Sequence, residues 1–203
     1  MKTLTNYINE AIKIGASASN ISVYSCRPRN KEELKKIIKE RIEKEGPNCD
    51  LNDIDVSQID DMSELFAFSE FNGDISKWNV SNVENMNVMF LGSDFTGNIS
   101  KWDVSKVKKM HGMFEDNCFN GDISNWDVSS VEKMSYMFNN SKFNQDISKW
   151  DVRNVKEMDF MFYDAKTFNQ DISNWKINKD CNTFLMFTRC KIKEEFKPKI
   201  KEK

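Results

Sequence analysis

The chain has 203 residues, a formal net charge of −2 at neutral pH and 31% charged residues. It is long enough to bury a substantial core, and no stretch approaches 18 apolar residues, so the sequence predicts no membrane insertion. Residues 1–50 hold ten basic and seven acidic residues, residues 51–188 hold 13 and 22, and residues 189–203 hold seven and three. The acidic middle argues against nucleic acid as a partner, because that binding requires a basic surface to neutralise phosphates.

Residues 1–30 are predicted to form a flexible leader. Asn6, Asn9 and Glu10 interrupt the apolar run that a secretory signal would need, so we expect none. Without such a signal the expected location is cytoplasmic or within an assembly such as a virion. The five cysteines of the chain have no metal-type spacing, and we expect free thiols in a reducing compartment.

Residues 31–50 are predicted to form a capping helix and a linker. An apolar stripe runs along residues 34–42, Asn30 is placed as N-cap with Glu33 three residues on, and Gly46-Pro47 ends the helix. A charged helix with one narrow apolar face, placed just before a repeat array, is typical of an N-terminal cap. An independent partner-binding helix is the alternative interpretation.

Residues 51–191 contain one pattern written repeatedly. Five copies begin at Phe71, Phe95, Phe119, Phe143 and Phe168, at spacings of 24, 24, 24 and 25 residues, and residues 51–70 form a more divergent sixth copy. A single copy cannot bury its own apolar face, so neighbouring copies must stack. The predicted class is therefore an α/β solenoid, leucine-rich-repeat-like, with six coils of about 24 residues.

Two apolar periods divide each copy. Ile75, Trp78 and Val80 have the spacing of a leucine-rich-repeat strand, and the sequence predicts a short parallel strand there. The residues from Val83 to Phe90 recur at three and four, with Ser81 and Glu84 as a capping box, and predict a short helix. Residues 192–203 form a charged tail that we expect to be solvated.

Several residue types form rungs along the array. Five tryptophans and the paired Met/Phe positions, such as Met113-Phe114, could form a sugar platform or a binding groove, but their inward spacing favours a core. A first acidic rung needs a compensating lysine, backbone donor or cation: Asp103, Asp127 and Asp151. A second rung is expected to close turns through backbone hydrogen bonds: Asp74, Asp122, Asp146 and Asp171.

No pattern in the sequence points to catalysis. The single histidine, His111, occupies a position that varies among copies, and no nucleotide-binding, zinc-binding or nucleophile motif is present. We expect a chain that is not an enzyme and has no cofactor and no metal site.

The repeated pattern F-N-x-D-I-S-x-W-D-V-S-x-V-x-x-M-x-x-M-F resembles the repeat of the BspA-like leucine-rich-repeat surface proteins, a domain of unknown function. The resemblance covers residues 51–190. It implies a leucine-rich-repeat-like fold, a location at the cell surface and a role in recognition or adhesion. It implies no catalytic residue. The short leader also resembles the N-terminal peptides of some tailed-phage structural proteins.

Two functions follow as hypotheses. The first is a monomeric interaction module that binds a protein or a glycan; the second is a structural component of a virion or other assembly, attached through its N-terminal segment. For the first, the predicted strands would present a concave polar face of Lys77, Asn79, Lys101, Asp103, Asn125, Asp127, Lys149, Asp151 and Arg153. The alternative surface is the predicted convex helices, where exposed or half-exposed positions vary and single aromatic residues among them could anchor a partner: Val88, His111, Tyr136, Phe160 and Tyr163.

Overall fold

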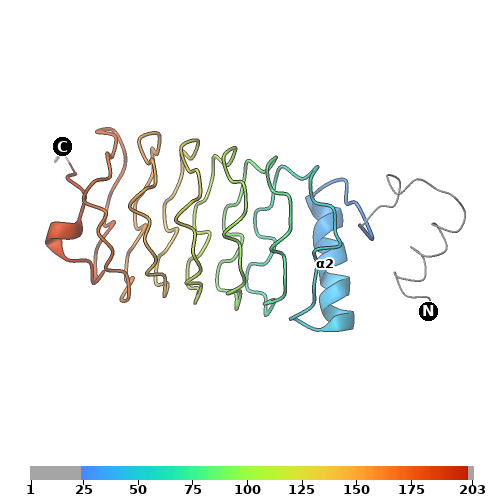
Figure 1. Ribbon diagram of the computed structural model, residues 1–203. Helices are drawn as coiled ribbons and strands as arrows, with labels where there is room; N and C mark the ends of the chain where they lie inside the picture. The colour runs from blue at the N-terminus through green and yellow to red at the C-terminus, as the bar shows by residue number, and fades with distance from the viewer. Residues whose placement is uncertain (1–23, 201–203) are drawn as a thin grey trace, which may run out of the picture.

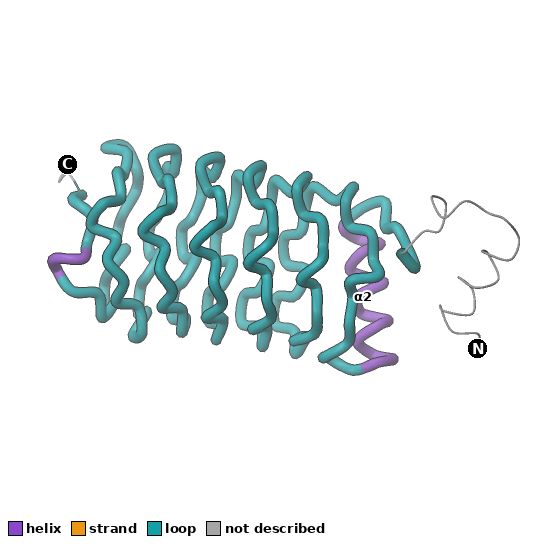
Figure 2. Tube along the Cα trace, viewed as in Figure 1, coloured by secondary structure: helices purple, strands orange, loops and turns teal. Residues whose placement is uncertain are grey.

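The computed structural model describes residues 24–200 and shows a row of stacked chain turns behind one helix (Figure 1). Helix α2 spans Lys31–Glu45, and the short 3-10 helix η2 spans Glu194–Phe196. Elsewhere in the described part, turns and isolated parallel bridges replace helices and extended strands (Figure 2). None of the helices in residues 24–200 is long and apolar enough to cross a membrane. Most of the predicted leader, residues 1–23, lies outside the described residues.

Helix α2 occupies the residues for which the sequence predicts a helix. The N–H of Glu33 donates to Oδ1 of the N-cap Asn30 at 3.0 Å, and the N–H of Gly46 donates to the carbonyl of Ile42 at 2.8 Å. Leu34 and Ile38 are buried and belong to the common core. The helix therefore covers the first turn of the stack, as a cap should.

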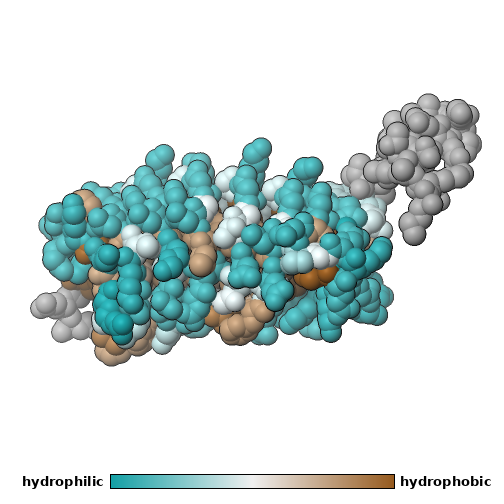
Figure 3. Space-filling view, turned by 90° about the horizontal axis from the view of Figure 1, so that it is seen from below, coloured by the Kyte–Doolittle hydropathy of each residue, from teal (hydrophilic) through white to brown (hydrophobic). Residues whose placement is uncertain are grey.

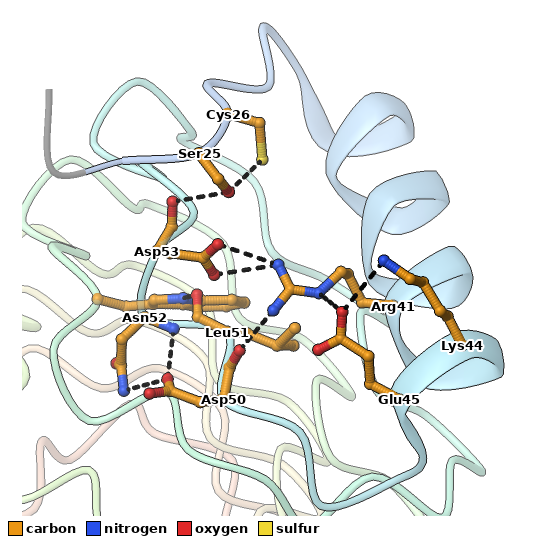
Figure 4. A network of polar contacts seen from close by, with 10 residues as sticks. Ser25, Cys26, Arg41, Lys44, Glu45, Asp50, Leu51, Asn52 and Asp53 are labelled. Atoms are coloured by element: carbon orange, nitrogen blue, oxygen red, sulfur yellow. Dashed lines mark hydrogen bonds and ion pairs between the residues drawn. The ribbon is translucent and has the colours of Figure 1, made fainter. Parts of the chain in front are cut away.

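Arg41 fastens α2 to the first repeat (Figure 4). One guanidinium nitrogen donates to both carboxylate oxygens of Asp53 at 3.1 Å, and the other terminal nitrogen donates to the carbonyl of Asp50 at 2.9 Å. Burial tends to raise the pKa of Asp53, but hydrogen bonds from Ser25 and Arg41 lower it below its ordinary value. The segment before the helix joins the same network, since the N–H of Ser25 donates to the Asp53 carbonyl at 2.7 Å.

The repeats are joined by a backbone ladder, which we define as six equivalent segments: 61–68, 85–92, 109–116, 133–140, 157–164 and 182–189. In each of the first five, four alternate N–H groups donate to carbonyls of the next segment at 2.7–3.1 Å. Met62, for example, donates to the Asn85 carbonyl at 2.8 Å, and Met86 donates to the Lys109 carbonyl at 2.8 Å. All these donors point toward the C-terminal end of the row and all the acceptors point toward α2.

The short helices predicted in each repeat are absent from the described residues, and the ladder occupies their place. Hydrogen bonds within a segment span three residues, as from the N–H of Met89 to the carbonyl of Met86 at 3.3 Å. Every fourth residue has positive φ, for example Val88 at 49° and Gly92 at 57°, which no α-helix tolerates. Successive turns also bring residues three and four apart to one side, so the apolar spacing did not require a helix.

The predicted parallel strand at Ile75, Trp78 and Val80 is wrong as well. The N–H of Trp78 donates to the carbonyl of Ile75 at 3.1 Å, and that of Val83 donates to the carbonyl of Val80 at 2.9 Å, so this part of each copy is a pair of tight turns. We call residues 74–83 and their equivalents the turn side. The row is nearly straight in the perpendicular views of Figures 1 and 3. The leucine-rich-repeat-like class itself stays a prediction.

The predicted core rungs are buried. Each of the five tryptophans is 4% exposed, and its indole N–H donates to a carbonyl of the preceding copy, as from Trp126 to Ile99 at 3.2 Å. The Met/Phe rungs from Met89-Phe90 to Met161-Phe162 are fully buried, and phenylalanines of successive copies stack with ring centroids 5.7 Å apart at Phe90 and Phe114. The tryptophans and the methionines of the repeats are therefore core residues, and no disulfide bond joins the five cysteines, all of which lie in residues 24–200.

The charged tail is only partly solvated. Ile192 and Pro198 are buried, and the N–H of Ile172 donates to the carbonyl of Phe196 at 3.0 Å. The N–H of Lys193 donates to Oδ1 of Asn169 at 3.0 Å. Residues 192–198 thus begin one more turn against the last copy, because three apolar side chains among the lysines continue the repeat pattern.

Candidate binding surface

The polar residues predicted as a binding face lie on the turn side, without the strands that were to present them. Lys77, Lys101, Asn125 and Lys149 are exposed beside the buried tryptophans. A shallow depression of about 350 Å³ lies between the last two copies, and its lining includes Lys149, Asp151, Arg153 and Lys176. The structure therefore brings the C-terminal members of the predicted set together and leaves the others spread along the row.

The acidic rungs on the turn side mainly close turns. Oδ1 of Asp103 accepts from the N–H of Ser105 at 3.1 Å and from its hydroxyl at 2.6 Å, and these bonds lower the pKa of Asp103. Oδ1 of Asp127 accepts from the N–H of Ser129 at 3.0 Å. Arg153 holds the pKa of Asp151 at about 2 through its side-chain hydrogen bonds. Hydrogen bonds from backbone and side-chain donors thus offset the mutual repulsion of these carboxylates.

The second acidic rung closes turns as predicted. The carboxylate of Asp74 accepts from the N–H of Ser76 at 2.9 Å, and the same bond recurs at Asp122, Asp146 and Asp171 at 2.8–3.0 Å. In residues 24–200 no group of three or more histidines, cysteines, aspartates or glutamates has the geometry of a metal site.

A second surface is built from aromatic residues of the ladder. We define the aromatic strip as His111, Tyr136, Phe160, Tyr163 and Phe184. Tyr136 and Phe160 stack with ring centroids 4.8 Å apart and an interplanar angle of 16°. His111 lies 5.5 Å from Tyr136, and Phe160 lies 5.5 Å from Tyr163 and 5.6 Å, edge to face, from Phe184. Rings from four successive copies therefore make one continuous surface.

The strip reaches solvent. Phe184 is 62% exposed and the neighbouring Leu185 is 39% exposed, whereas His111, Tyr136, Phe160 and Tyr163 are half-buried. Figure 3 shows one hydrophilic face of the molecule on which hydrophobic residues gather toward the C-terminal end and near the middle. Large apolar side chains that remain exposed in one contiguous group are typical of interaction sites.

The backbone of the strip is strained. Tyr136 and Phe160 have φ of 62° and 57°, and Leu185 has φ of 52°. This left-handed conformation costs about 1–2 kcal/mol for a residue with a side chain, and Gly112 occupies the equivalent position of an earlier copy. Hydrogen bonds of the backbone ladder stabilise this conformation: the N–H of Tyr136 donates to the Asp159 carbonyl at 3.0 Å, and the N–H of Phe160 donates to the Phe184 carbonyl at 2.9 Å. The same positive φ recurs at every fourth residue of each ladder segment, so it belongs to the ladder as a whole and not to the strip alone.

Acidic groups flank the strip. Oδ1 of Asp159 accepts from the hydroxyl of Ser135 at 2.6 Å and from the amide of Asn182 at 3.1 Å. Burial, followed by the charge of Asp116, raises the pKa of Glu115 to about 7. Burial and then the charges of Asp159 and Glu115 raise the pKa of Tyr136. The strip thus has the carboxyl groups of Glu115 and Asp159 at its border.

The sequence pointed to part of this surface. His111, Tyr136, Phe160 and Tyr163 were named as possible anchors, but on separate convex helices. Phe184 was missed because its equivalents in the two preceding copies, Asp159 and Ser135, are polar. His111 is half-buried, and its backbone N–H donates to Oδ1 of Asn87 at 3.0 Å.

Comparison with known proteins places the chain in one family. No curated protein and no solved structure matches it. A family model described as "Mycoplasma protein of unknown function, DUF285" matches twice, over residues 33–118 and 93–201, and so spans α2 and all the repeats. The chain therefore belongs to this DUF285 family.

Proposed function

We propose that the chain is a non-enzymatic interaction module whose aromatic strip binds a protein partner. The observation that carries the proposal is the contiguous set of rings at Tyr136, Phe160 and Phe184, of which Phe184 is 62% exposed and the other two are half-buried. Their neighbours in the backbone ladder hold them in place, so little conformational entropy is lost on binding. The resemblance of the repeat to BspA-like, leucine-rich-repeat surface proteins supports recognition as the role.

The ring geometry favours a protein over a glycan. Sugars stack on open aromatic faces, but Tyr136 and Phe160 cover one face of each other at 4.8 Å. The ring centroid of His111 lies 5.5 Å from that of Tyr136, and the ring centroid of Phe184 lies 5.6 Å from that of Phe160. What remains accessible is mainly ring edges, which suit apolar side chains of a protein. The acidic border around Asp159 suits a partner with basic residues beside its apolar contact.

The test is site-specific photo-crosslinking in the full-length chain. A photoreactive phenylalanine analogue replaces Phe160 in one variant and Asn125 on the turn side in another, and each is exposed to fractionated cell-surface and cytosolic proteins. We expect one defined protein adduct from position 160 and none from 125. Adducts from position 125 alone would transfer the function to the turn side and refute the strip.

A matched pair of variants checks the same conclusion by affinity. Tyr136→Ser with Phe160→Ser should reduce capture of the crosslinked protein more than tenfold, because both central rings are lost. Charge reversal of Asp103, Asp127 and Asp151 together should leave capture within twofold. Circular dichroism must show that both variants remain folded. The opposite outcome would establish the polar residues of the turn side as the binding surface.

A further inference from the structure

The backbone ladder ends in an open row of donors at the C-terminal end. In segment 182–189 the carbonyls take bonds from segment 157–164, but four alternate N–H groups have no acceptor among residues 24–200: Thr183, Leu185, Phe187 and Arg189. Their equivalents in the preceding segment donate at 2.8–2.9 Å: Met158, Phe160, Phe162 and Asp164. The edge is therefore one strand short of a completed ladder.

This edge offers donors and no acceptors. The carbonyls of Thr183, Leu185 and Phe187 accept bonds within their own turns, at 3.2, 3.2 and 3.1 Å. Two copies of the edge therefore cannot pair with each other, since neither supplies a carbonyl. The occupant must present a row of acceptors, as the next repeat would.

The opposite end of the ladder is covered by helix α2. Nζ of Lys31 donates to the hydroxyl of Ser63 at 3.0 Å and lies 3.6 Å from the carboxylate of Asp61, and Ile38 and Leu65 line the same small cavity. A helix over a sheet edge is a common way to block strand addition. Because α2 blocks the carbonyl end, a second copy cannot complete the ladder head to tail unless α2 leaves.

The C-terminal tail leaves the donor edge uncovered. It runs along the start of the last copy, where Lys193 bonds to Asn169, and along its turn side, where Phe196 bonds to Ile172. Within residues 24–200 it meets the ladder at Phe187, whose ring centroid lies 5.7 Å from Nζ of Lys197. The two ends of the ladder thus differ: one is capped by a helix, and the other keeps its row of N–H groups.

Charge indicates what chemistry fits this edge. Lys191 and Lys193 directly follow this segment, and four parallel N–H groups add partial positive charge. Phe184 and Leu185 add exposed apolar surface on the same segment. We propose that the donor edge binds an extended, acidic segment of a partner protein, whose backbone carbonyls accept from these N–H groups. The inference rests on the ladder and not on binding at Tyr136 and Phe160.

Amide NMR and hydrogen exchange of the full chain test this proposal. In the free protein, the amides of Thr183, Leu185, Phe187 and Arg189 should exchange at least tenfold faster than their equivalents in segment 157–164. An eight-residue peptide of alternating valine and glutamate should shift these four amides and slow their exchange. A valine–lysine peptide of the same length should do neither.

Variants separate charge from backbone pairing. Lys191→Glu with Lys193→Glu should weaken binding of the glutamate peptide at least fivefold, whereas the matched change of Lys77 and Lys101 on the turn side should leave it unchanged. The proposal is wrong if the four amides are already protected from hydrogen exchange in the free protein. It is also wrong if their NMR signals do not shift with the valine–glutamate peptide, or if the valine–lysine peptide binds with the same affinity. If the amides shift with protein concentration alone, the occupant is a second copy, and the acidic segment is refuted.

Tyr136→Ser alone provides the link to the proposed function. Tyr136 lies two ladder segments before the donor edge and its ring contacts Phe160, not Phe184, so its loss should leave peptide binding at the donor edge intact. The two proposals can therefore fail independently: loss of partner binding at the aromatic strip would not refute peptide binding at the donor edge, and the reverse also holds.

Discussion

Gly73 lies against the linker that follows α2, and replacing it with alanine should be strongly destabilising. A Cβ built at Gly73 would lie 2.0 Å from the carbonyl oxygen of Cys49 and 2.7 Å from the ring of Phe71. Contacts below 3.0 Å essentially never occur at a Cβ, and a backbone oxygen cannot rotate away. The two chain segments must therefore separate by about 1 Å.

That separation breaks the hydrogen bonds between residues 72–74 and residues 47–51. Asn72 donates to the Pro47 carbonyl at 2.9 Å, Asp74 to that of Cys49 at 3.2 Å, and Leu51 to that of Asp74 at 2.9 Å. Each bond contributes about 1 kcal/mol net, and the lost unfolded-state entropy of glycine returns about 0.4–1 kcal/mol. We expect Gly73→Ala to lower the free energy of unfolding by about 2–3 kcal/mol.

Gly121→Ala is the matched control. Its Cβ would meet only the ring of Phe119 at 2.8 Å, and Gln145 occupies the equivalent position of the next copy, so a side chain fits there. We expect a change below about 1 kcal/mol. Urea unfolding followed by tryptophan emission and far-ultraviolet circular dichroism measures both variants. Equal losses for the two alanine variants would refute the close approach at Gly73.

Three further outcomes follow from buried groups. The pKa of Glu115 is raised to about 7 from an ordinary value of 4.5, so between these pH values the folded state holds a proton that the unfolded chain releases. The stability of the protein should therefore fall as the pH rises from 4.5 to 7 and stay lower above that range. Melting scans across this range should show a smaller dependence of the melting temperature on pH for Glu115→Gln. Asn117 donates to the Ser93 carbonyl at 2.7 Å and accepts from Phe119 at 2.6 Å in the core, so Asn117→Ala should lower the unfolding free energy by about 1–3 kcal/mol, measured by urea unfolding. Asn117→Ser, which copies Ser93, should cost less than half as much. Native tryptophan emission should be blue-shifted and shielded from acrylamide, because every indole is buried; emission like that of free tryptophan would contradict this.

Repetition made the packing readable from the sequence. A spacing of about 24 residues requires equivalent side chains to stack, so the burial of Trp126, Met137 and Phe138 followed from spacing alone. Helix α2 was predictable for a different reason: its N-cap at Asn30 and its stop at Gly46 are local signals. The turn-closing role of Asp146 was local too, because an aspartate reaches the N–H two residues on.

Backbone conformation was decided by contacts between copies. The spacing of Met86, Met89 and Phe90 is shared by a helix and by successive turns, and only the copy-to-copy bonds select the turns. Those bonds let Tyr136 and Phe160 adopt positive φ, which their local preference opposes. The sequence by itself determined which side chains are buried, because burial follows the period. The tertiary structure decided the rest, including the aromatic strip and the donor edge, because both are made by hydrogen bonds between residues more than 20 positions apart.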